Sequence, residues 1–261
     1  MRSKNCYNFL SHPSTKDFMI KRLSRQTVDF VISAGAECRA AYYTKRLNMR
    51  KFSSPCDWMK NYTLNDYLHI LKTGGEEMFK CAHFDHSKNG AVDEQNGMIS
   101  LHDFTANIPL DYQLPVFYEK MHRRTLNTIE KINQSRAVGV IMHRTAPYRE
   151  IVHFAESLCD LFPKTLFHII NFRDIPKMTS IEIGDLVQTE HYTLQEVCFN
   201  DEHPDGRNQQ EAPQVWIGNK HVWLKLLRQK FYVKGWLFTL IRKKMRRRYE
   251  KVLKRFGHSR F

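Results

Sequence analysis

Glycine and proline are scarce in this chain, with 11 and 9 copies among 261 residues. Together with a hydrophobic fraction of 42%, this scarcity excludes a collagen-like or disordered chain and predicts one sizeable core. No run of about eighteen uncharged apolar residues occurs, so we expect no transmembrane helix. The first residues also carry no apolar stretch that fits a secretory signal, and the sequence therefore predicts a cytoplasmic protein.

Regular cysteine spacing is missing as well. No C-x-x-C pair is present, which argues against a zinc ribbon and against a disulfide framework. Free thiols in a reducing compartment fit best. His83 and His86 have no companions that complete a zinc set, so we expect neither a metal nor another cofactor. The cysteines are Cys6, Cys38, Cys56, Cys81, Cys159 and Cys198.

Acidic residues are almost absent from the end of the chain. From Trp223 to Phe261 there are 14 Lys or Arg and one acid, Glu250, so this segment carries +13 of the total charge of +14. The preceding part is nearly neutral. We therefore expect three regions, a polar lead-in (1–26), a single α/β domain (27–230) and a basic amphipathic helical tail (231–261).

The middle of the chain alternates between strand and helix patterns. "TVDFVIS", "RAVGVIMHR" and "TLFHIINFRD" are apolar along their whole length, and the helical pattern "REIVHFAESLCDLFP" separates the last two. Strands of this kind are typical of a parallel sheet. The sequence thus predicts an α/β fold, a mostly parallel sheet covered by helices on both faces. A ligand would lie at a switch point or at the carboxyl ends of the strands.

Further elements follow from capping residues and periodicity. "ECRAAYYTKRLN" predicts a helix that ends near Asn48, and Thr63 is the expected N-cap of the next helix, which stops at Gly74. "MISLHDF" predicts a short strand that contains His102. The segment "LPVFYEKMHRRTLNTIEKINQS" predicts a helix with an apolar stripe formed by Val116, Met121, Leu126, Ile129 and Ile132.

Cys38 stands where the first strand runs into a helix. A helix N-terminus favours a thiolate, its free N–H groups can form an oxyanion hole, and Gly35 permits a sharp turn and close approach of a substrate. The competing interpretation is a small apolar residue that only packs, because cysteine is often buried.

A nucleophilic cysteine needs a base and a group that orients the base. His102 and His143 both follow probable strands and compete for the role of base, whereas His168 inside "LFHII" is expected to be a core residue. Asp57 and Asp201 are the candidates for the orienting group, because neighbouring Asp103 would point to the opposite face of a strand. For Asp57, capping the next turn is the alternative.

These segments together resemble a bacterial family of unknown function whose members are described as papain-like cysteine peptidases. The matching elements are the Ser-x-Gly-x-x-Cys turn "SAGAEC", the Pro-x-Asp-Trp element "PCDW", the His-Asp-Phe element "HDF", the late "FND", and the Trp-x-Gly of "VWIGN" followed by Trp223. They span roughly residues 28 to 230.

The resemblance implies Cys38 as nucleophile, His102 as base and Asp57 as an assisting acid. It also implies a hydrolase or acyl transferase acting on a peptide or a glycan-linked substrate, with a link to surface-glycan assembly. We expect the substrate side of the site to be formed by Gly35, Trp58, Asp103, Asp201 and Trp216.

Two other functions stay open. One is a non-catalytic accessory or ligand-binding protein of glycan biosynthesis in which Cys38 only packs. The other is a glycan-modifying transferase that uses His102 and Asp103 without a covalent cysteine intermediate.

The basic tail has three interpretations. Apolar residues recur at intervals of three and four from Val233 to Phe256, opposite a Lys/Arg face, so the tail could lie on an anionic inner-membrane surface. It could instead pack on the protein's own core, or bind nucleic acid, for which the neutral body shows no recognition motif.

Overall fold

A computed structural model describes residues 23–206, 214–235 and Met245. The helices are α1 (Cys38–Arg46), α2 (Leu64–Lys72), α3 (Leu110–Asn133), α4 (Tyr148–Leu161) and α5 (Lys220–Lys230), with a 3₁₀ turn at Val215–Ile217. The strands are β1 (Gln26–Val28), β2 (Phe30–Ser33), β3 (Met59–Lys60), β4 (Ala82–Asp85), β5 (Gly90–Asp93), β6 (Ile99–Ser100), β7 (Ala137–His143), β8 (Leu166–Asp174), β9 (Glu182–Ile183), β10 (Val187–Gln188), β11 (Tyr192–Phe199) and β12 (Phe231–Val233).

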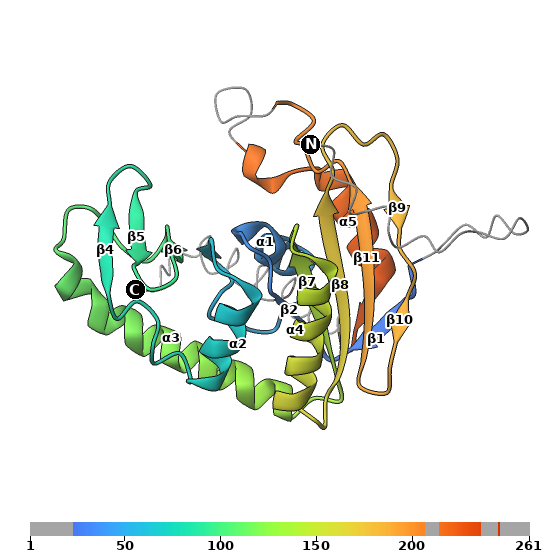
Figure 1. The fold of residues 1–261 in the computed structure, drawn as a ribbon, viewed down its shortest axis with the longest axis horizontal. Helices are drawn as coiled ribbons and strands as arrows, with labels where there is room; N and C mark the ends of the chain where they lie inside the picture. The colour runs from blue at the N-terminus through green and yellow to red at the C-terminus, as the bar shows by residue number, and fades with distance from the viewer. Residues whose placement is uncertain (1–22, 207–213, 236–244, 246–261) are drawn as a thin grey trace, which may run out of the picture.

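The main sheet is mostly parallel, as predicted. Its order is β10-β11-β8-β7-β2, with β9 also paired to β11 (Figure 1). Strands β2, β7, β8 and β11 are parallel, and β9 and β10 run antiparallel to β11. The four parallel strands lie side by side in chain order, so they form no topological switch point. Of the two predicted ligand positions, only the carboxyl ends of the strands fit this sheet.

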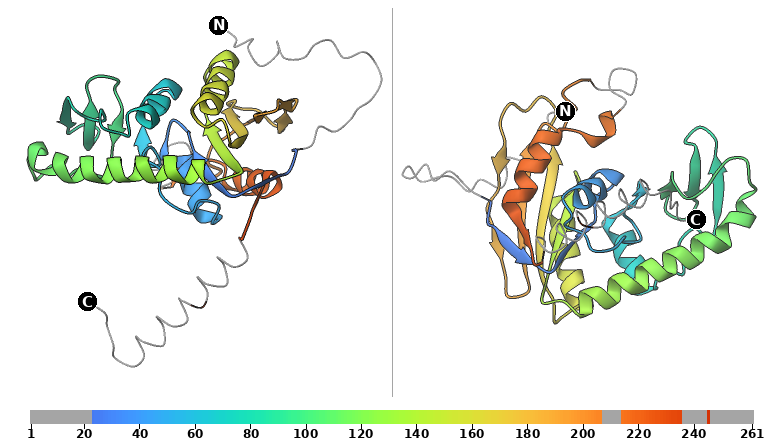
Figure 2. Two further views of the ribbon diagram at one scale, coloured as in Figure 1. Left: turned by 90° about the horizontal axis from the view of Figure 1, so that it is seen from below. Right: turned by 180° about the vertical axis from the view of Figure 1, so that it is seen from behind.

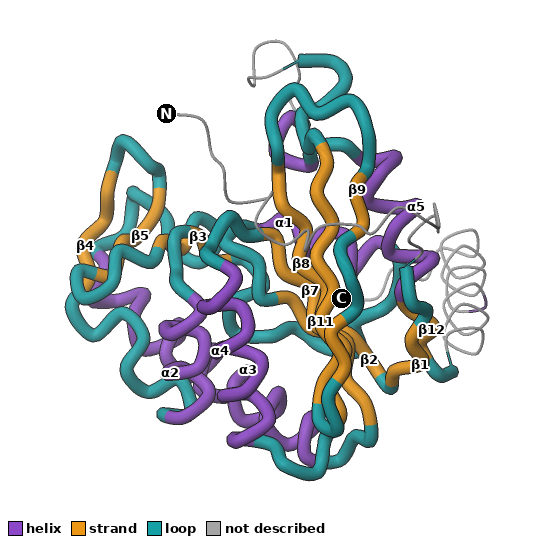
Figure 3. The backbone as a smooth tube through the Cα atoms, turned by 45° about the vertical axis from the view of Figure 1, so that its right-hand side comes forward, coloured by secondary structure: helices purple, strands orange, loops and turns teal. Residues whose placement is uncertain are grey.

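Helices cover both faces of this sheet. One core cluster packs α2, α3 and α4 against one face, and a second packs α1 and α5 against the other. Figure 3 shows the strands between these two groups of helices. The α/β prediction with both faces covered is therefore confirmed.

Part of the segment before α3 forms a second, smaller sheet. Its order is β3-β6-β5-β4, all antiparallel. Strand β6 ends at Ser100, so the predicted strand "MISLHDF" is shorter than expected and His102 lies in the bend that follows it. This bend, rather than a strand, positions the His102 imidazole.

Helix α3 runs from the small sheet to the main sheet (Figures 1 and 2). Its buried face differs from the predicted stripe, because Val116 is 68% exposed and Leu126 is 47% exposed. Threonines occupy two positions of the true buried face, where each hydroxyl donates to a carbonyl four residues earlier, so polarity hid this face from an apolar pattern. The buried residues are Phe117, Met121, Thr125, Thr128 and Ile132.

Local signals set the helix ends correctly. Thr63 caps α2 in a reciprocal capping box with Asp66. Asn48, just after α1, has a φ of 55°, and Gly74 after α2 has a φ of 66°. Both are left-handed conformations that end a helix.

The last described segment returns to the body of the protein. Phe231–Val233 form β12, which pairs in parallel with β1, so the beginning of the predicted helical tail is a strand. Phe231 and Val233 are buried in the core cluster with α5. Residues 236–244 and 246–261 of the predicted tail lie outside the described residues. Among the helices that the structure describes, none has the length and apolarity to cross a membrane.

The register of α3 can be tested by truncation. We expect Phe117→Ala to lower the free energy of unfolding by about 3–5 kcal/mol, because Phe117 is buried against Phe79 and Phe104. The exposed neighbour gives the control, and Val116→Ala should change it by no more than about 0.5 kcal/mol. Urea unfolding of the two variants measures both values. Equal losses would show that α3 is rotated from the described register.

Candidate active site

Cys38 and His102 meet where α1 faces the small sheet. The Sγ atom of Cys38 lies 3.9 Å from Nε2 of His102, a contact between residues 64 positions apart. Cys38 is the first residue of α1 and only 5% exposed, whereas the His102 side chain is exposed. The fold thus brings the predicted nucleophile and the predicted base together.

The first turn of α1 presents backbone donors beside this thiol. Glu37 occupies the N-cap position in an extended conformation, and its side chain makes no capping hydrogen bond. The first N–H groups of a helix have no partner within the helix. In the described part of the chain no side chain caps them, so they can stabilise an oxyanion formed at Cys38.

The pKa of Cys38 runs against the prediction of a preformed thiolate. Burial raises the pKa of this thiol, the charge of Lys60 opposes the rise, and Glu37 adds to it. Desolvation outweighs the nearby lysine. The sequence predicts both a helix N-terminus that favours the thiolate and a base that takes the proton, and a raised pKa increases the need for the base.

Asp57 does not serve as the partner of His102. Its carboxylate accepts hydrogen bonds from Ser33 Oγ at 2.8 Å, from the backbone N–H of Ser54 at 3.1 Å and from Arg50. Burial raises the pKa of Asp57, and the charge of Arg50 opposes this. The carboxylate instead ties the loop before β3 to the end of β2, which joins the Ser of "SAGAEC" to the Asp of "PCDW" through one hydrogen bond.

Trp58 supports the imidazole in place of a carboxylate. The rings of Trp58 and His102 meet edge to face, with centroids 5.8 Å apart. Among the described residues no hydrogen bond engages the second ring nitrogen of His102. The site is thus a Cys–His dyad with an aromatic neighbour.

The residues after His102 anchor its bend. Asp103 accepts a hydrogen bond from Ser100 Oγ at 2.6 Å and pairs with Lys120 of α3. Phe104 is buried against Phe79 and Phe117. Asp103 was predicted to bind substrate, but these contacts commit its carboxylate to holding the bend between β6 and α3.

Asp201 is a buried structural carboxylate. Its side chain is 0% exposed and accepts from Arg39 Nη1 at 2.5 Å, from the backbone N–H of Asn219 at 2.7 Å and from Trp223 Nε1 at 2.9 Å. Nε2 of His143 lies 3.2 Å away. Burial alone would raise the pKa of Asp201, but His143 and Arg39 hold it below its usual value. The sequence suggested Asp201 as a partner of His102 and as a substrate contact. Its buried contacts fit neither role.

The Trp-x-Gly element completes the surroundings of Asp201. Gly218 has a φ of +61°, and a Cβ there would lie 2.4 Å from Asp201 Oδ1, so only glycine fits. The carbonyl of Trp216 accepts from Arg39 Nε at 2.8 Å, and the Trp216 ring packs edge-on against Tyr42 at 5.0 Å. Trp216, predicted to bind substrate, thus fixes Arg39, the residue that follows Cys38.

The structure also separates the candidate histidines. His143 lies at the end of β7 between Asp201 and Trp223, whereas the imidazole that contacts Cys38 is that of His102. His168 is buried with a hydrogen-bond contact to Thr193 at 2.9 Å, and burial, together with Lys230, lowers its pKa to about 4. It is a core histidine, as predicted.

Gly35 allows α1 and the end of β7 to pack closely against the turn before Cys38. The sequence predicted only a sharp turn and the approach of a substrate. A Cβ on Gly35 would lie 3.0 Å from Cβ of Ala40 and 3.6 Å from the backbone nitrogen of His143. Arg144 fixes the same turn, because its Nε donates to the carbonyl of Ala34 at 2.8 Å. The turn before Cys38 is therefore held by β2, β7 and α1 together.

Sequence comparison agrees with this geometry. A family model described as "Putative papain-like cysteine peptidase" matches residues 29–259. The chain belongs to this family. No curated protein and no solved structure matches the chain. The family description names a cysteine peptidase, and in this member the thiol of Cys38 contacts a histidine imidazole.

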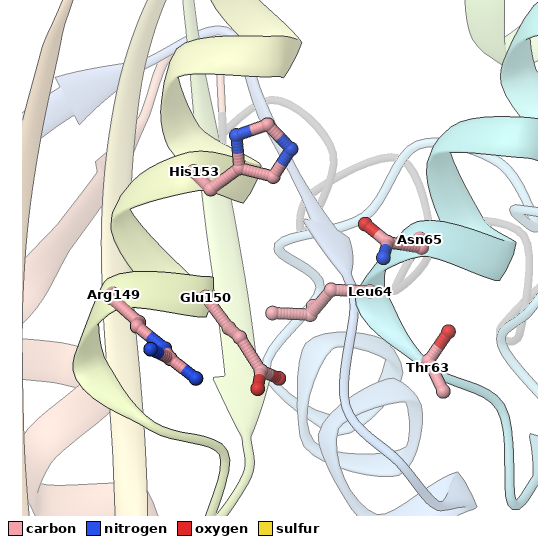
Figure 4. A pocket seen from close by; sticks show the side chains of 6 residues that line it. All are labelled: Thr63, Leu64, Asn65, Arg149, Glu150 and His153. Atoms are coloured by element: carbon pink, nitrogen blue, oxygen red, sulfur yellow. The ribbon is translucent and has the colours of Figure 1, made fainter.

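Two surface hollows lie at other residues. One, of about 280 Å³, lies between the first turns of α2 and α4 and is shown in Figure 4; Thr63, Leu64, Asn65, Arg149, Glu150 and His153 line it. The other, of about 430 Å³, is lined by Gly75, Glu76, Lys80, Tyr118, Glu119 and His122. Neither includes Cys38 or His102. Within the described ranges no three His, Cys, Asp or Glu side chains gather into a metal-binding cluster.

The structure adds cations to the site that sequence reasoning missed. Arg39 and Arg50 hold the two buried carboxylates, and Lys45 and Lys60 lie around Trp58 and Cys38. Asp57 lies 7 positions from Arg50, and Asp201 lies 162 positions from Arg39. No motif of the sequence joined these pairs, although Arg39 directly follows the cysteine.

We expect Asp201→Asn to lower the free energy of unfolding at pH 7 by about 3–5 kcal/mol, because it removes one charge of a buried pair. Since the pKa of Asp201 is lowered on folding, its contribution is present above the ordinary Asp value of 3.8 and is lost as the pH falls below it. Denaturant unfolding between pH 7 and pH 3 should show a smaller acid loss in the variant.

The exposed carboxylate of Asp205 gives the matched control. Asp205→Asn should change the free energy of unfolding by no more than about 0.5 kcal/mol, because surface ion pairs contribute little. If the two variants were equally stable, Asp201 would not have the structural role assigned here.

Proposed function

We propose that this protein is a cysteine-dependent hydrolase or acyl transferase in which Cys38 is the nucleophile and His102 the general base. The observation that carries the proposal is the 3.9 Å contact between Cys38 Sγ and His102 Nε2 at an uncapped helix N-terminus. The family description supports the same chemistry.

The first step forms a thioester. His102 Nε2 takes the proton of the Cys38 thiol as sulfur attacks the carbonyl carbon of the substrate. The N–H groups of the first turn of α1 stabilise the negative oxygen of the tetrahedral intermediate. The carbonyl re-forms, and the leaving group departs with the proton from His102.

The second step regenerates the enzyme. Water, or another acceptor in a transferase, gives its proton to His102 and attacks the thioester carbon. The acid or the transferred acyl product leaves, and the Cys38 thiol recovers its proton. The aromatic ring of Trp58, beside His102, is our candidate for contact with the substrate.

The substrate class follows from the resemblance alone. We propose a peptide or glycan-linked acyl group, in bacterial surface-glycan assembly. The rival proposals are a non-catalytic accessory role in that assembly and a transferase that uses His102 and Asp103 directly. Against the latter, the Asp103 carboxylate is bound by Ser100 and Lys120.

Acylation of Cys38 tests the proposal without knowledge of the substrate. p-Nitrophenyl acetate should acetylate Cys38 faster than the exposed Cys81, as followed by p-nitrophenolate release and by peptide mass mapping. His102→Ala should slow acetylation near pH 7 by about 10²–10⁴-fold, because the base is lost. This deficit should shrink as the pH rises through the raised pKa of Cys38, where the thiolate forms without a base.

Two variants make this test specific. Cys38→Ala should abolish the rapid phase, and His86→Ala, at an exposed histidine of the β4–β5 turn, should leave it unchanged. Acetylation of Cys38 that is no faster than that of Cys81, or that is indifferent to His102→Ala, would contradict the catalytic proposal and favour the accessory role.

We also propose that the basic tail docks the protein on an anionic membrane surface. The support is the charge of +13 that the chain carries from Trp223 onward, and the apolar residues that recur at intervals of three and four from Val233 to Phe256. Because β12 pairs with β1 and Lys234 bonds to Val28 and Asp29, a deletion has to begin after Gly235 to spare the body.

Deletion of residues 236–261 should abolish binding to phosphatidylcholine vesicles that contain phosphatidylserine, measured by co-sedimentation. The full chain should bind these vesicles, lose binding at high salt, and bind vesicles of phosphatidylcholine alone weakly. The circular dichroism of the deleted chain controls for folding. Equal binding by the two chains would argue for a tail that packs on the protein or binds another partner.

A further inference from the structure

Two positively charged side chains lie near the ring of Trp58, which is the aromatic neighbour of His102. Lys45 Nζ lies 5.7 Å and Arg50 Cζ 5.5 Å from the centroid of its ring, and the His102 ring lies at 5.8 Å. Cations near an indole are attracted by its negative face, so the Trp58 ring stabilises both side chains near it. A cation from α1, another from the loop before β3 and the His102 imidazole therefore all neighbour the same Trp58 ring.

Lys60 adds a cation from the other direction. It ends β3, and the next residue, Asn61, donates its backbone N–H to the carbonyl of Ala36 at 3.1 Å. This bond attaches the end of β3 to the turn that leads into Cys38. Lys60 also makes the largest electrostatic contribution that lowers the pKa of the Cys38 thiol, although burial outweighs it.

Most of the carboxylates around the site are already neutralised. Asp57 is buried and paired with Arg50, and Asp103 is paired with Lys120. Glu37 is the exposed acid at the N-cap of α1. Within the part of the chain that the structure describes, neither Lys45 nor Lys60 has a carboxylate at ion-pair distance. The partial positive charge of the α1 N-terminus adds to these two free cations.

We propose that the Cys38–His102 site takes an anionic substrate, one that carries a negative group next to the carbonyl attacked by Cys38, with Lys45 and Lys60 as the residues that bind it. This assignment rests on the proposed function for the role of Cys38, and it names the class of its substrate. The lysines bind charge beside the reacting carbonyl, while Arg50 stays committed to Asp57 and Lys120 to Asp103.

Two alkylating reagents of similar size but different charge measure this property directly. Iodoacetate is an anion and iodoacetamide is neutral. In both, the thiolate attacks the carbon that bears iodine and iodide leaves, so the ratio of their rate constants at one cysteine cancels the thiol pKa. Quantitative peptide mass spectrometry gives this ratio at Cys38 and at exposed Cys81 in the same full-length chain. We expect the ratio at Cys38 to exceed that at Cys81 by on the order of tenfold and to fall with added salt.

Charge-removing variants assign the effect to the two lysines. Lys60→Gln and Lys45→Gln should each lower the ratio at Cys38, and the double variant should bring it near the ratio at Cys81. Lys72→Gln, with the same charge change at an exposed position in the last turn of α2, should leave it unaltered. If one of the two lysine variants misfolds, the other variant and the salt dependence still test the proposal.

The proposal is overturned if Cys38 and Cys81 give the same ratio of iodoacetate to iodoacetamide rate constants. It is also overturned if neither lysine substitution changes this ratio at Cys38. It is also overturned if neither reagent reaches Cys38, because a thiol closed to small anions cannot lie in such a binding site. Alkylation needs no turnover and no His102. A failed acetylation test would therefore remove the catalytic role while leaving the anion preference measurable, and the reverse result is equally distinct.

Discussion

Two buried carboxylates hold the turn between β2 and α1 on which Cys38 stands. Asp57 binds Ser33, just before the turn, and Asp201 binds Arg39, just after Cys38. A buried charge is strongly unfavourable unless donors surround it, so each carboxylate requires its partners to keep their places. The loop before β3, the end of β7 and the start of α5 are positioned by this requirement. The thiol is thus placed by its neighbours, and Nε2 of His102 lies 3.9 Å from its sulfur.

The base is held in a different way. The bend that carries His102 is fixed by the two residues that follow, because Asp103 pairs with Lys120 and Phe104 packs on Phe117. Lys120 and Phe117 both belong to α3, the helix that runs from the small sheet to the main one (Figure 2). Helix α3 therefore helps to position the bend that carries His102. The motif residues after the histidine act through this helix, which explains why a histidine in a short bend can face a cysteine on another element.

Local patterns were sufficient for most helix and strand positions, whereas the choice of Cys38 and His102 came from the family resemblance. The apolar strands, the Thr63 cap and the stop at Gly74 depend on neighbours in sequence, and all were predicted. The roles of Asp57 and Asp201 were not, because their donors Ser33 and Arg39 lie 24 and 162 positions away. The same limit explains the error on α3, where Thr125 and Thr128 face the core by bonding their own helix. Motif order identified which residues matter, but only the packing shows which of them touch the thiol.

Burial raises the pKa of Cys38, whereas nearby positive charge lowers it. The two effects also differ in range, so they can serve two separate tasks, activation of the thiol and attraction of a substrate. Desolvation is local to the sulfur and is the largest cause of its raised pKa, which favours the neutral thiol; in the proposed mechanism His102 takes its proton. The charges of Lys45 and Lys60 reach farther, up to about a Debye length of 8–10 Å, and act on whatever approaches the site. A neutral thiol is less exposed to oxidation than a thiolate, because the thiolate is the reactive form. In the proposed mechanism the lysines attract the substrate and the imidazole activates the nucleophile, so neither task would depend on a permanently ionised cysteine.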